Sequence, residues 1–326
     1  MEEIKCRMSE RSRKQFDDIV NQRVLGASTH IHMIGEMFLD LAEIALEEKI
    51  SGSELKENIK EVGDFFKCTR GEASCAVTNG INQMVYSMGH IEDKTVYEAV
   101  KTVKKAVEDY RRKSNQDIKK VAEYAKRLAE GMNKILVFDY SSTVNEFLKN
   151  LEPDKIQVYI PESRSINGGA EFAKTAVKQG LKVHFIPDAG IMYFLRQCDG
   201  AFCGAETMFP DGTAFNTIGT DMVGLICKFW KIPFYILTPM LKLDLRGIYG
   251  YQRTPVVNNL KHRFEGLGFT EQERNNIDFH CPELLPVAPS YITGFITEEG
   301  IIPTDGLYEQ ALAYGRKMGG DEKYDR

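Results

Sequence analysis

Apolar residues recur at three- and four-residue intervals through the first 128 residues of the chain. This spacing gives 31–48 one apolar helix face, and 94–128 is the longest stretch with the same period. Ser114 and Asn115 mark an expected break of that stretch into two helices. The pattern therefore predicts a helical amino-terminal domain over 1–128.

Short apolar runs alternate with helical stretches in the rest of the chain. The predicted strands are 134–138, 156–160, 182–186, 200–204 and 233–237. The predicted helices are 142–150, 169–180, a short one ending near 196, and 219–230. This β-α alternation predicts an α/β fold, in which the helical domain is followed by a Rossmann-like parallel-sheet domain over 129–326. The tail from 276 is expected to close the sheet, and 245–270, which has no clear period, is expected to form a surface excursion.

The composition is typical of an ordinary globular protein, with 43% hydrophobic and 27% charged residues. The net charge of -5 gives no overall basic field for nucleic acid, so no direct nucleic-acid partner is predicted. Segment 101–127 holds ten basic and four acidic residues, and without interleaved aromatic residues we interpret it as a solvated helix face.

The longest apolar stretch, 222–241, is interrupted by two lysines and two prolines, so no membrane span is predicted. The first 14 residues are charged and lack the apolar segment of a secretory signal. Seven scattered cysteines without a CxxC pair give no support for a zinc site. We therefore expect a cytoplasmic protein with no metal.

Four predicted strands in succession are each followed by a carboxylate: Asp139, Glu162, Asp188 and Glu206. Because the carboxyl ends of parallel strands lie at one edge of the sheet, these groups are expected to surround one crevice. Two carboxylates across a pocket can differ in pKa, so that one acts as a base and the other as an acid. Such a pair suits proton transfer on a sugar. A divalent cation held by the same oxygens, and loop-bracing roles, are the alternatives.

Sites for a phosphate are also visible. Segments 163–169 and 218–220 each open a predicted helix with glycine, and Thr220 is a candidate N-cap. Arg23 and Arg70 precede small residues and further helices, and each could supply positive charge to a phosphate. Ordinary caps and surface arginines explain these features equally well. The chain has neither GxGxxG nor GxxxxGK[ST], so no nucleotide cofactor is predicted.

Three segments carry a family resemblance: 161–190 (PESRS…PDAG), 203–236 (CGAET…PFYI) and 291–303 (YITGFITEEGIIP). They resemble the family that contains the alpha, beta and delta regulatory subunits of translation initiation factor 2B. The same family contains methylthioribose-1-phosphate isomerase and ribose-1,5-bisphosphate isomerase. The resemblance implies a helical domain, a Rossmann-like domain, and a homodimer or higher homo-oligomer.

The resemblance also implies site residues. Asp139 stands where the isomerases have a catalytic cysteine, and Glu206 stands where they have a catalytic aspartate. Thr217 replaces a lysine, Leu25 replaces an arginine, and Arg70 is kept. Non-catalytic subunits of the initiation factor share the missing cysteine and can share the glutamate.

Two functional hypotheses follow. The first is an aldose–ketose isomerase that acts on a ribose 1-phosphate type substrate through Asp139 and Glu206, without a cofactor. The second is a catalytically silent regulatory subunit that binds a sugar phosphate or nucleotide. The first is preferred because both catalytic positions hold carboxylates. The predicted substrate-binding residues are Arg23, Gly26, Ala27, Arg70, Tyr140, Ser141, Glu162, Arg164, Asp188, Asn216, Thr217, Gly219, Thr220 and Lys242.

Overall fold

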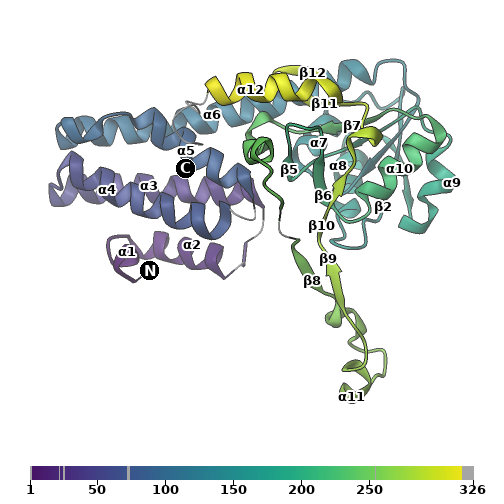
Figure 1. Cartoon of the computed structure of the whole chain (residues 1–326), viewed down its shortest axis with the longest axis horizontal. Helices are drawn as coiled ribbons and strands as arrows, with labels where there is room; N and C mark the ends of the chain where they lie inside the picture. Colours follow the sequence, from purple (N-terminus) through teal and green to yellow (C-terminus); the bar gives the residue numbers. More distant parts are fainter. Residues whose placement is uncertain (1, 22, 25, 72–73, 254, 318–326) are drawn as a thin grey trace. The chain divides into compact units, whose positions relative to one another are not determined.

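The computed structural model describes residues 2–21, 23–24, 26–71, 74–253 and 255–317, which form two units (Figure 1). Unit 1 is Met1–Asp117 with Leu241–Leu243, and unit 2 is Ile118–Met240 with Asp244–Arg326. Helix α6 carries the chain from unit 1 into unit 2. The units thus divide inside this helix, whereas the domain boundary at 128 stays a prediction.

Unit 1 is helical, with a core built from the apolar faces of its helices. The helices are α1 (Glu2–Cys6), α2 (Glu10–Val20), α3 (Ala27–Glu48), α4 (Gly52–Phe66), a π-helical turn (Lys67–Gly71), α5 (Cys75–Met88), a 3₁₀ turn (Ile91–Asp93) and α6 (Val96–Leu128). Phe16, Phe38 and Phe66 are fully buried in this core. No described helix is both long and apolar enough to cross a membrane.

Helix α6 corrects one expectation, because it runs through Ser114 and Asn115 without a break. Val107 is fully buried before this position and Val121 after it. A serine or an asparagine inside a helix costs at most about 0.7 kcal/mol relative to alanine. Packing on both sides of this position therefore outweighs that cost.

Unit 2 is built on a seven-stranded sheet in the order β12-β11-β7-β4-β1-β2-β3. Its strands are β1 (Lys134–Phe138), β2 (Gln157–Pro161), β3 (Lys182–Ile186), β4 (Gly200–Cys203), β7 (Phe234–Leu237), β11 (Gly294–Thr297) and β12 (Gly300–Pro303). All neighbours are parallel except β11 and β12. The predicted fold class, a helical part followed by a parallel-sheet part, is confirmed.

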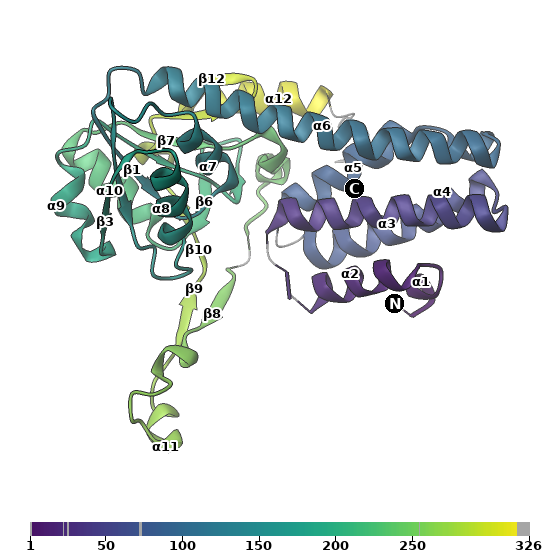
Figure 2. The same cartoon turned by 180° about the vertical axis from the view of Figure 1, so that it is seen from behind.

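Helices cover both faces of this sheet, and α12 ends the described chain. They are α7 (Ser142–Lys149), α8 (Gly169–Lys178), α9 (Ile191–Leu195), α10 (Thr220–Trp230) and α12 (Leu307–Lys317). Helix α10 lies in front of the sheet in Figure 1, and α7 and α8 lie in front of it in Figure 2. The strand order changes direction between β1 and β4, which is where ligands bind in doubly wound sheets.

Two smaller sheets complete unit 2. One is β10-β6-β5, formed by β5 (Thr207–Met208), β6 (Ala214–Thr217) and β10 (Leu284–Val287). The other pairs β8 (Val257–Asn259) with β9 (His280–Pro282), and this two-stranded ribbon carries α11 (Glu271–Arg274) at its tip. The ribbon extends away from the rest of unit 2 in Figure 1. The stretch 245–270, expected to form a surface excursion, contributes the strand β8 to this ribbon.

Candidate functional site

A hydrogen-bond network links the ends of three neighbouring strands. Ser163, which follows β2, donates from its hydroxyl to Asp139 Oδ1 at 3.1 Å. The backbone N–H of the same serine donates to Asp188 Oδ1 at 2.9 Å, and Arg164 N–H donates to Asp188 Oδ2 at 2.8 Å. Asp139 follows β1 and Asp188 follows β3. The carboxylates expected at this edge therefore share partners, with Asp188 bracing the loop that presents Ser163.

The backbone at this edge adopts conformations that L-residues rarely occupy. Asp139, Ser163 and Asn167 have φ angles of 59°, 49° and 55°. Asp139 and Ser163 are also buried, with exposed fractions of 3% and 0%. Left-handed backbone costs on the order of 1–2 kcal/mol at such residues and persists only where the surroundings impose it. Its concentration here marks this edge as a candidate site.

Gly168 allows the loop after β2 to approach the loop after β1. A Cβ atom on Gly168 would lie 2.6 Å from the Tyr140 backbone nitrogen and 3.1 Å from Asp139 Oδ1. Gly168 is the N-cap of α8 and contributes no side-chain cap. The amino end of α8 is therefore close to the Asp139 carboxylate, and a larger residue at 168 would force the two loops apart.

On the other side of the strand-order change, the loop after β4 meets the loop after β1. A Cβ atom on Gly204 would lie 2.5 Å from the Ser141 hydroxyl oxygen. Glu206 follows this glycine, is half-buried, and donates its backbone N–H to Phe215 O at 2.8 Å. Asp139 and Glu206 thus follow the adjacent strands β1 and β4. Their joint catalytic role stays a prediction.

The start of α10 is held by side chains that were expected to bind substrate. Asn216 Nδ2 donates to Thr220 Oγ1 at 3.0 Å, and that hydroxyl donates to Thr217 O at 2.8 Å. The N-cap is Gly219, with φ 102°, and Thr220 is the first helical residue. The prediction that Thr220 is the N-cap was therefore wrong by one position, because only glycine readily adopts this backbone angle.

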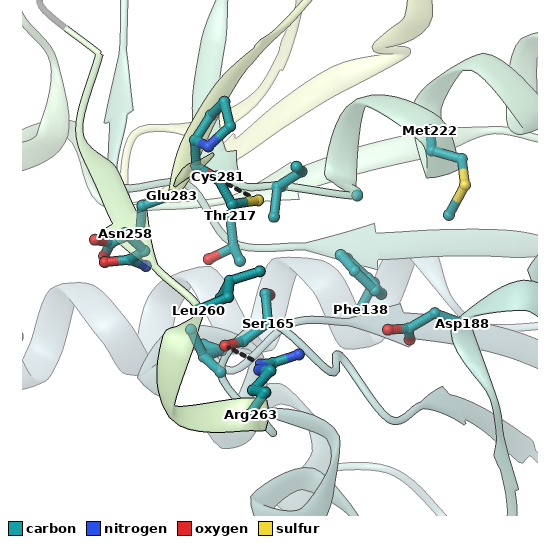
Figure 3. Close-up of a pocket in the computed structure, with 14 residues that line it drawn as sticks. Phe138, Ser165, Asp188, Thr217, Met222, Asn258, Leu260, Arg263, Cys281 and Glu283 are labelled. Carbon is teal, nitrogen blue, oxygen red and sulfur yellow. Dashed lines mark hydrogen bonds between the residues drawn. The ribbon is translucent and has the colours of Figure 1, made fainter. Parts of the chain in front are cut away.

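Unit 2 contains a cavity of about 270 Å³ at this edge of the sheet (Figure 3). Its lining residues are Phe138, Ser165, Ile166, Asp188, Thr217, Ile218, Gly219, Met222, Asn258, Leu260, Arg263, Cys281, Pro282 and Glu283. Three of the predicted site residues are among them, namely Asp188, Thr217 and Gly219. Asp139 is the neighbour of the lining residue Phe138 and joins the cavity wall through the Ser163 network.

The remaining predicted residues near this edge have other contacts. Glu162 is half-buried and lies 3.9 Å from the guanidinium of Arg164, measured between Oε2 and Nη1. The ring of Tyr140 packs against Phe172 at 5.6 Å between centroids, and Ser141 is the N-cap of α7. None of these contacts tests the predicted role of the four residues in substrate binding.

Sequence reasoning missed the ribbon that forms one wall of the cavity. Arg263 donates from Nη2 to the carbonyl oxygens of Arg164 and Ser165, at 2.9 Å for Ser165. Figure 3 shows this contact beside Leu260 at the cavity wall. The polar and apolar pattern of 245–270 gave no sign of this wall, because it depends on a contact almost a hundred residues away in sequence.

Two buried cysteines, Cys198 just before β4 and Cys203 at its end, give no support for thiol chemistry. Cys203, at the end of β4, is fully buried. Burial raises the pKa of its thiol well above the ordinary value, and the thiol of Cys227 and the charge of Asp139 raise it further. Burial also raises the pKa of Cys198 to about 12. Both groups are therefore protonated, and a protonated thiol is a poor nucleophile.

Five predicted residues belong to unit 1. Arg23 lies 3.2 Å from Asp18, Gly26 is the N-cap of α3 with φ 96°, and Ala27 is the first residue of that helix. Arg70 is in the π-helical turn, and its Nε is buried without a hydrogen-bond partner. Lys242 O accepts from Cys75 Sγ at 3.3 Å. Their contribution to a substrate site stays a prediction.

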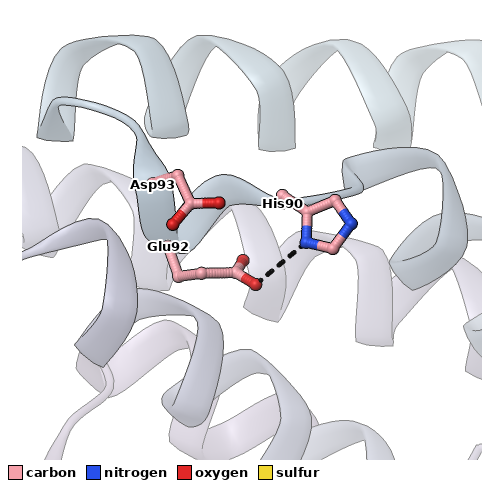
Figure 4. A group of neighbouring side chains, drawn as sticks. All are labelled: His90, Glu92 and Asp93. Atoms are coloured by element: carbon pink, nitrogen blue, oxygen red, sulfur yellow. Dashed lines mark hydrogen bonds and ion pairs between the residues drawn. The ribbon is translucent and has the colours of Figure 1, made fainter.

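Unit 1 also brings together three side chains that resemble metal ligands (Figure 4). His90, Glu92 and Asp93 have ligand atoms within 4.8 Å of one another. Lys56 Nζ lies 2.6 Å from Glu92 Oε1, and this contact is the largest cause of a pKa lowered to about 2 for Glu92. An ammonium group already pairs with this carboxylate, so the cluster is better explained as a surface ion pair.

The fold and this edge together define a class of protein: a helical unit joined to a doubly wound parallel-sheet unit, with carboxylates and a cavity at the carboxyl ends of the strands. Comparison with known sequences identifies the family. The model of the initiation factor 2 subunit family matches residues 28–304. The chain belongs to this family.

Individual relatives carry different names. The chain is 24% identical to ribose 1,5-bisphosphate isomerase of Methanocaldococcus jannaschii, across 91% of this chain and 92% of that protein. It is 31% identical to methylthioribose-1-phosphate isomerase of Geotalea uraniireducens, across 48% of this chain and 46% of that protein. A crystal structure of translation initiation factor eIF-2B from Pyrococcus horikoshii OT3 matches with a TM-score of 0.69 and 21% identity, covering 91% of this chain and 98% of that one.

Proposed function

We propose that this chain is an aldose–ketose isomerase for a ribose 1-phosphate type sugar, and that Asp139 and Glu206 carry its proton transfers. The main support is the position of the two carboxylates, which follow the adjacent strands β1 and β4 where the strand order changes direction. The likeness to a ribose 1,5-bisphosphate isomerase over 91% of the chain adds to it.

The reaction needs one acid and one base. The C1–O4 bond of the sugar ring breaks, and the ring oxygen takes a proton from the protonated carboxyl. The hydrogen on C2 moves to C1 with its electron pair, as a hydride, and the C2 hydroxyl gives its proton to the second carboxylate as the ketone forms. Atoms and charge balance without a cofactor. A carboxylate pair suits these two transfers, because neighbouring carboxyls tend to hold different protonation states.

The cavity beside Phe138 favours an uncharged group at C5 of the sugar. Its described lining residues include three charged side chains, Asp188, Glu283 and Arg263. Arg263 already donates to two carbonyl oxygens. Two carboxylates and one committed guanidinium would repel a second phosphate dianion. We therefore expect a substrate with an uncharged substituent at C5 to be turned over faster than the 1,5-bisphosphate.

A silent regulatory subunit is the second candidate. It is supported by the family's initiation factor name and by the departures at Asp139 and Thr217 from the isomerase motifs. Such a protein would bind a sugar phosphate or nucleotide at the same edge and release no product. Proton NMR of the purified protein with a panel of ribose 1-phosphates separates the two, because it reports binding and isomerisation in one sample.

The carboxylate assignment is tested by Asp139→Asn and Glu206→Gln. Each change should lower turnover by ~10²–10⁴, the usual contribution of a general acid or base. Asp154→Asn is the matched control, because it makes the same chemical change at an exposed position of unit 2 outside the predicted site. Turnover that is unchanged in both site variants would reject the assignment, and binding without any product would favour the regulatory subunit.

A further inference from the structure

A phosphate-bearing substrate needs a cation, and the cavity in unit 2 offers little positive charge. Among the lining residues that the structure describes, Arg263 is the only cation, and it already donates to the carbonyl oxygens of Arg164 and Ser165. Thr217, also in the lining, is neutral and 6% exposed. Phosphate groups bind best to guanidinium or ammonium groups. If unit 2 supplies this cation, it therefore comes from beyond the cavity wall.

Arg253 brings a guanidinium next to the Glu206 position. Its Nη1 donates to Thr207 Oγ1 at 2.5 Å, and Thr207 directly follows Glu206 in the chain. The Cζ atom of the same group lies 5.6 Å from the ring centroid of Phe215. Thr207 is 1% exposed, and Arg253 is half-buried. A hydroxyl and an aromatic ring thus orient this guanidinium before any ligand binds.

The register of β5 and β6 places Arg253 on the same face of this small sheet as Thr217. Thr207 pairs with Phe215, and paired residues of antiparallel strands point to the same face. Phe215 and Thr217 are two residues apart in β6, so they share that face as well. Two residues of a strand span about 7 Å. The guanidinium therefore lies two strand positions from the part of the cavity wall that Thr217 forms.

We propose that Arg253 binds the phosphate of the substrate and thereby selects phosphorylated over unphosphorylated sugar. This inference rests on the proposed function, because it takes Glu206 to act at C1 and C2. The phosphate is attached to C1, so its cation belongs beside the residue that acts there, and Arg253 meets this requirement through Thr207. A guanidinium has five N–H donors in a fixed fork, which lets it hold a hydroxyl and a phosphate at once. The C5 end of the sugar then points toward the cavity.

Sugar affinity with and without the guanidinium tests this role. Saturation-transfer NMR with ribose 1-phosphate and with ribose gives two dissociation constants for each protein. Arg253→Gln should weaken ribose 1-phosphate binding by about 10- to 100-fold, the effect of losing a charged hydrogen-bonding group, and leave ribose binding within about twofold. Arg274→Gln is the matched control, because it makes the same change at a half-buried arginine in the tip of the ribbon.

Two results of this experiment would overturn the proposal. One is a loss of affinity by the same factor for ribose 1-phosphate and for ribose, which would show a structural role. The other is an unchanged affinity for ribose 1-phosphate in Arg253→Gln. Arg253→Lys keeps the charge but loses the fork, so it should recover part of the affinity. If the glutamine variant fails to fold, the lysine variant replaces it, and it should bind ribose 1-phosphate more weakly than the unaltered chain with ribose binding unaffected.

Turnover measurements separate this inference from the proposed reaction. If the unaltered chain binds ribose 1-phosphate through Arg253 but forms no ketose, the reaction is wrong and the phosphate site stands. If the chain forms the ketose and Arg253→Gln leaves KM unchanged, the reaction stands and the phosphate site is wrong. In an active enzyme, the supporting result is a KM raised by about 10- to 100-fold with kcat within about threefold. A chain that binds no ribose 1-phosphate would overturn both.

Discussion

The cavity in unit 2 has two walls that the sequence specifies in different ways, one formed by strand ends and one by the β8–β9 ribbon. The sheet wall holds Asp188, which follows β3 and was expected at this edge from the chain pattern alone. The ribbon wall holds Arg263, which comes from the segment with no clear period, and Glu283, which directly follows β9. Strand ends are placed by a repeated local unit, whereas the ribbon is placed by contacts between distant residues, such as Arg263 with Ser165. The proposed proton transfers thus lie at the strand ends, and the ribbon contributes the other wall of the cavity.

Gly168→Ala should break the sheet wall most severely. The new methyl group would meet the Tyr140 backbone nitrogen at 2.6 Å, and backbone cannot rotate away as a side chain can. We expect the free energy of unfolding to fall by about 3 kcal/mol, the upper part of the range for overpacking. Urea denaturation measures this change. Gly306→Ala is the control, because its nearest neighbour would be 3.8 Å away. Equal losses in the two variants would contradict the close approach.

Asp188→Ala should weaken the same wall by a smaller amount. It removes a carboxylate that accepts from the N–H groups of Ser163 and Arg164, and leaves them without this charged acceptor. The expected loss is about 2 kcal/mol in the free energy of unfolding. Asp188→Asn, which keeps one oxygen acceptor, should recover part of it. If the alanine variant has the same denaturation midpoint as the unaltered chain, the hydrogen bonds of Asp188 do not stabilise the fold.

Arg263→Ala should release the ribbon wall while the sheet wall stays intact. Losing its contacts with the carbonyl oxygens of Arg164 and Ser165 should lower the local opening free energy by about 1 kcal/mol. Hydrogen exchange should then speed up over β8 and β9 but not over β1. Arg274→Ala is the control, because that guanidinium contacts only Phe269 O within the ribbon tip among its described hydrogen bonds. Faster exchange throughout unit 2 would argue against a separate ribbon.

The smallest expected effect on stability concerns His184, in the middle of the edge strand β3. Burial is the largest cause of its lowered pKa, followed by the charges of Lys182 and Lys134. The unfolded chain therefore binds a proton near pH 6.5 more readily than the folded one, and stability should fall as pH drops from about 7.5 to about 5.5. His184→Phe keeps the stacking on Tyr159 and should flatten this part of the profile. Parallel profiles in both proteins would exclude His184 as the source.

Much of this architecture could be predicted from the chain pattern. The five predicted strands begin and end within one residue of the observed ones, because buried parallel strands leave continuous apolar runs. The boundaries of α10 needed finer information. Thr220 is a good capping residue by type, but the left-handed backbone of Gly219 decides where the helix begins.

The candidate site was only partly predictable. Asp139 and Asp188 were expected at one edge because each follows a predicted parallel strand, but the hydrogen bond from the Ser163 hydroxyl to Asp139 could not be predicted. Hydrogen-bond partners depend on side-chain directions in loops with left-handed residues, and local pattern does not encode these directions. From the sequence, Ser163 is expected only as part of a phosphate-binding turn.

The sequence by itself determined the helical first part, the β-α order of the second, and the carboxylate at the end of each of four successive strands. These follow from residue periodicity and from the geometry of parallel sheets, both of which act over short stretches of chain. Only the tertiary structure decided that Ser163 joins Asp139 to the Asp188 loop, that Arg263 brings the ribbon to the cavity, and that Leu225 and Phe229 of α10 are left exposed. Each of these depends on residues distant in sequence, whose meeting is set by packing rather than by local preference.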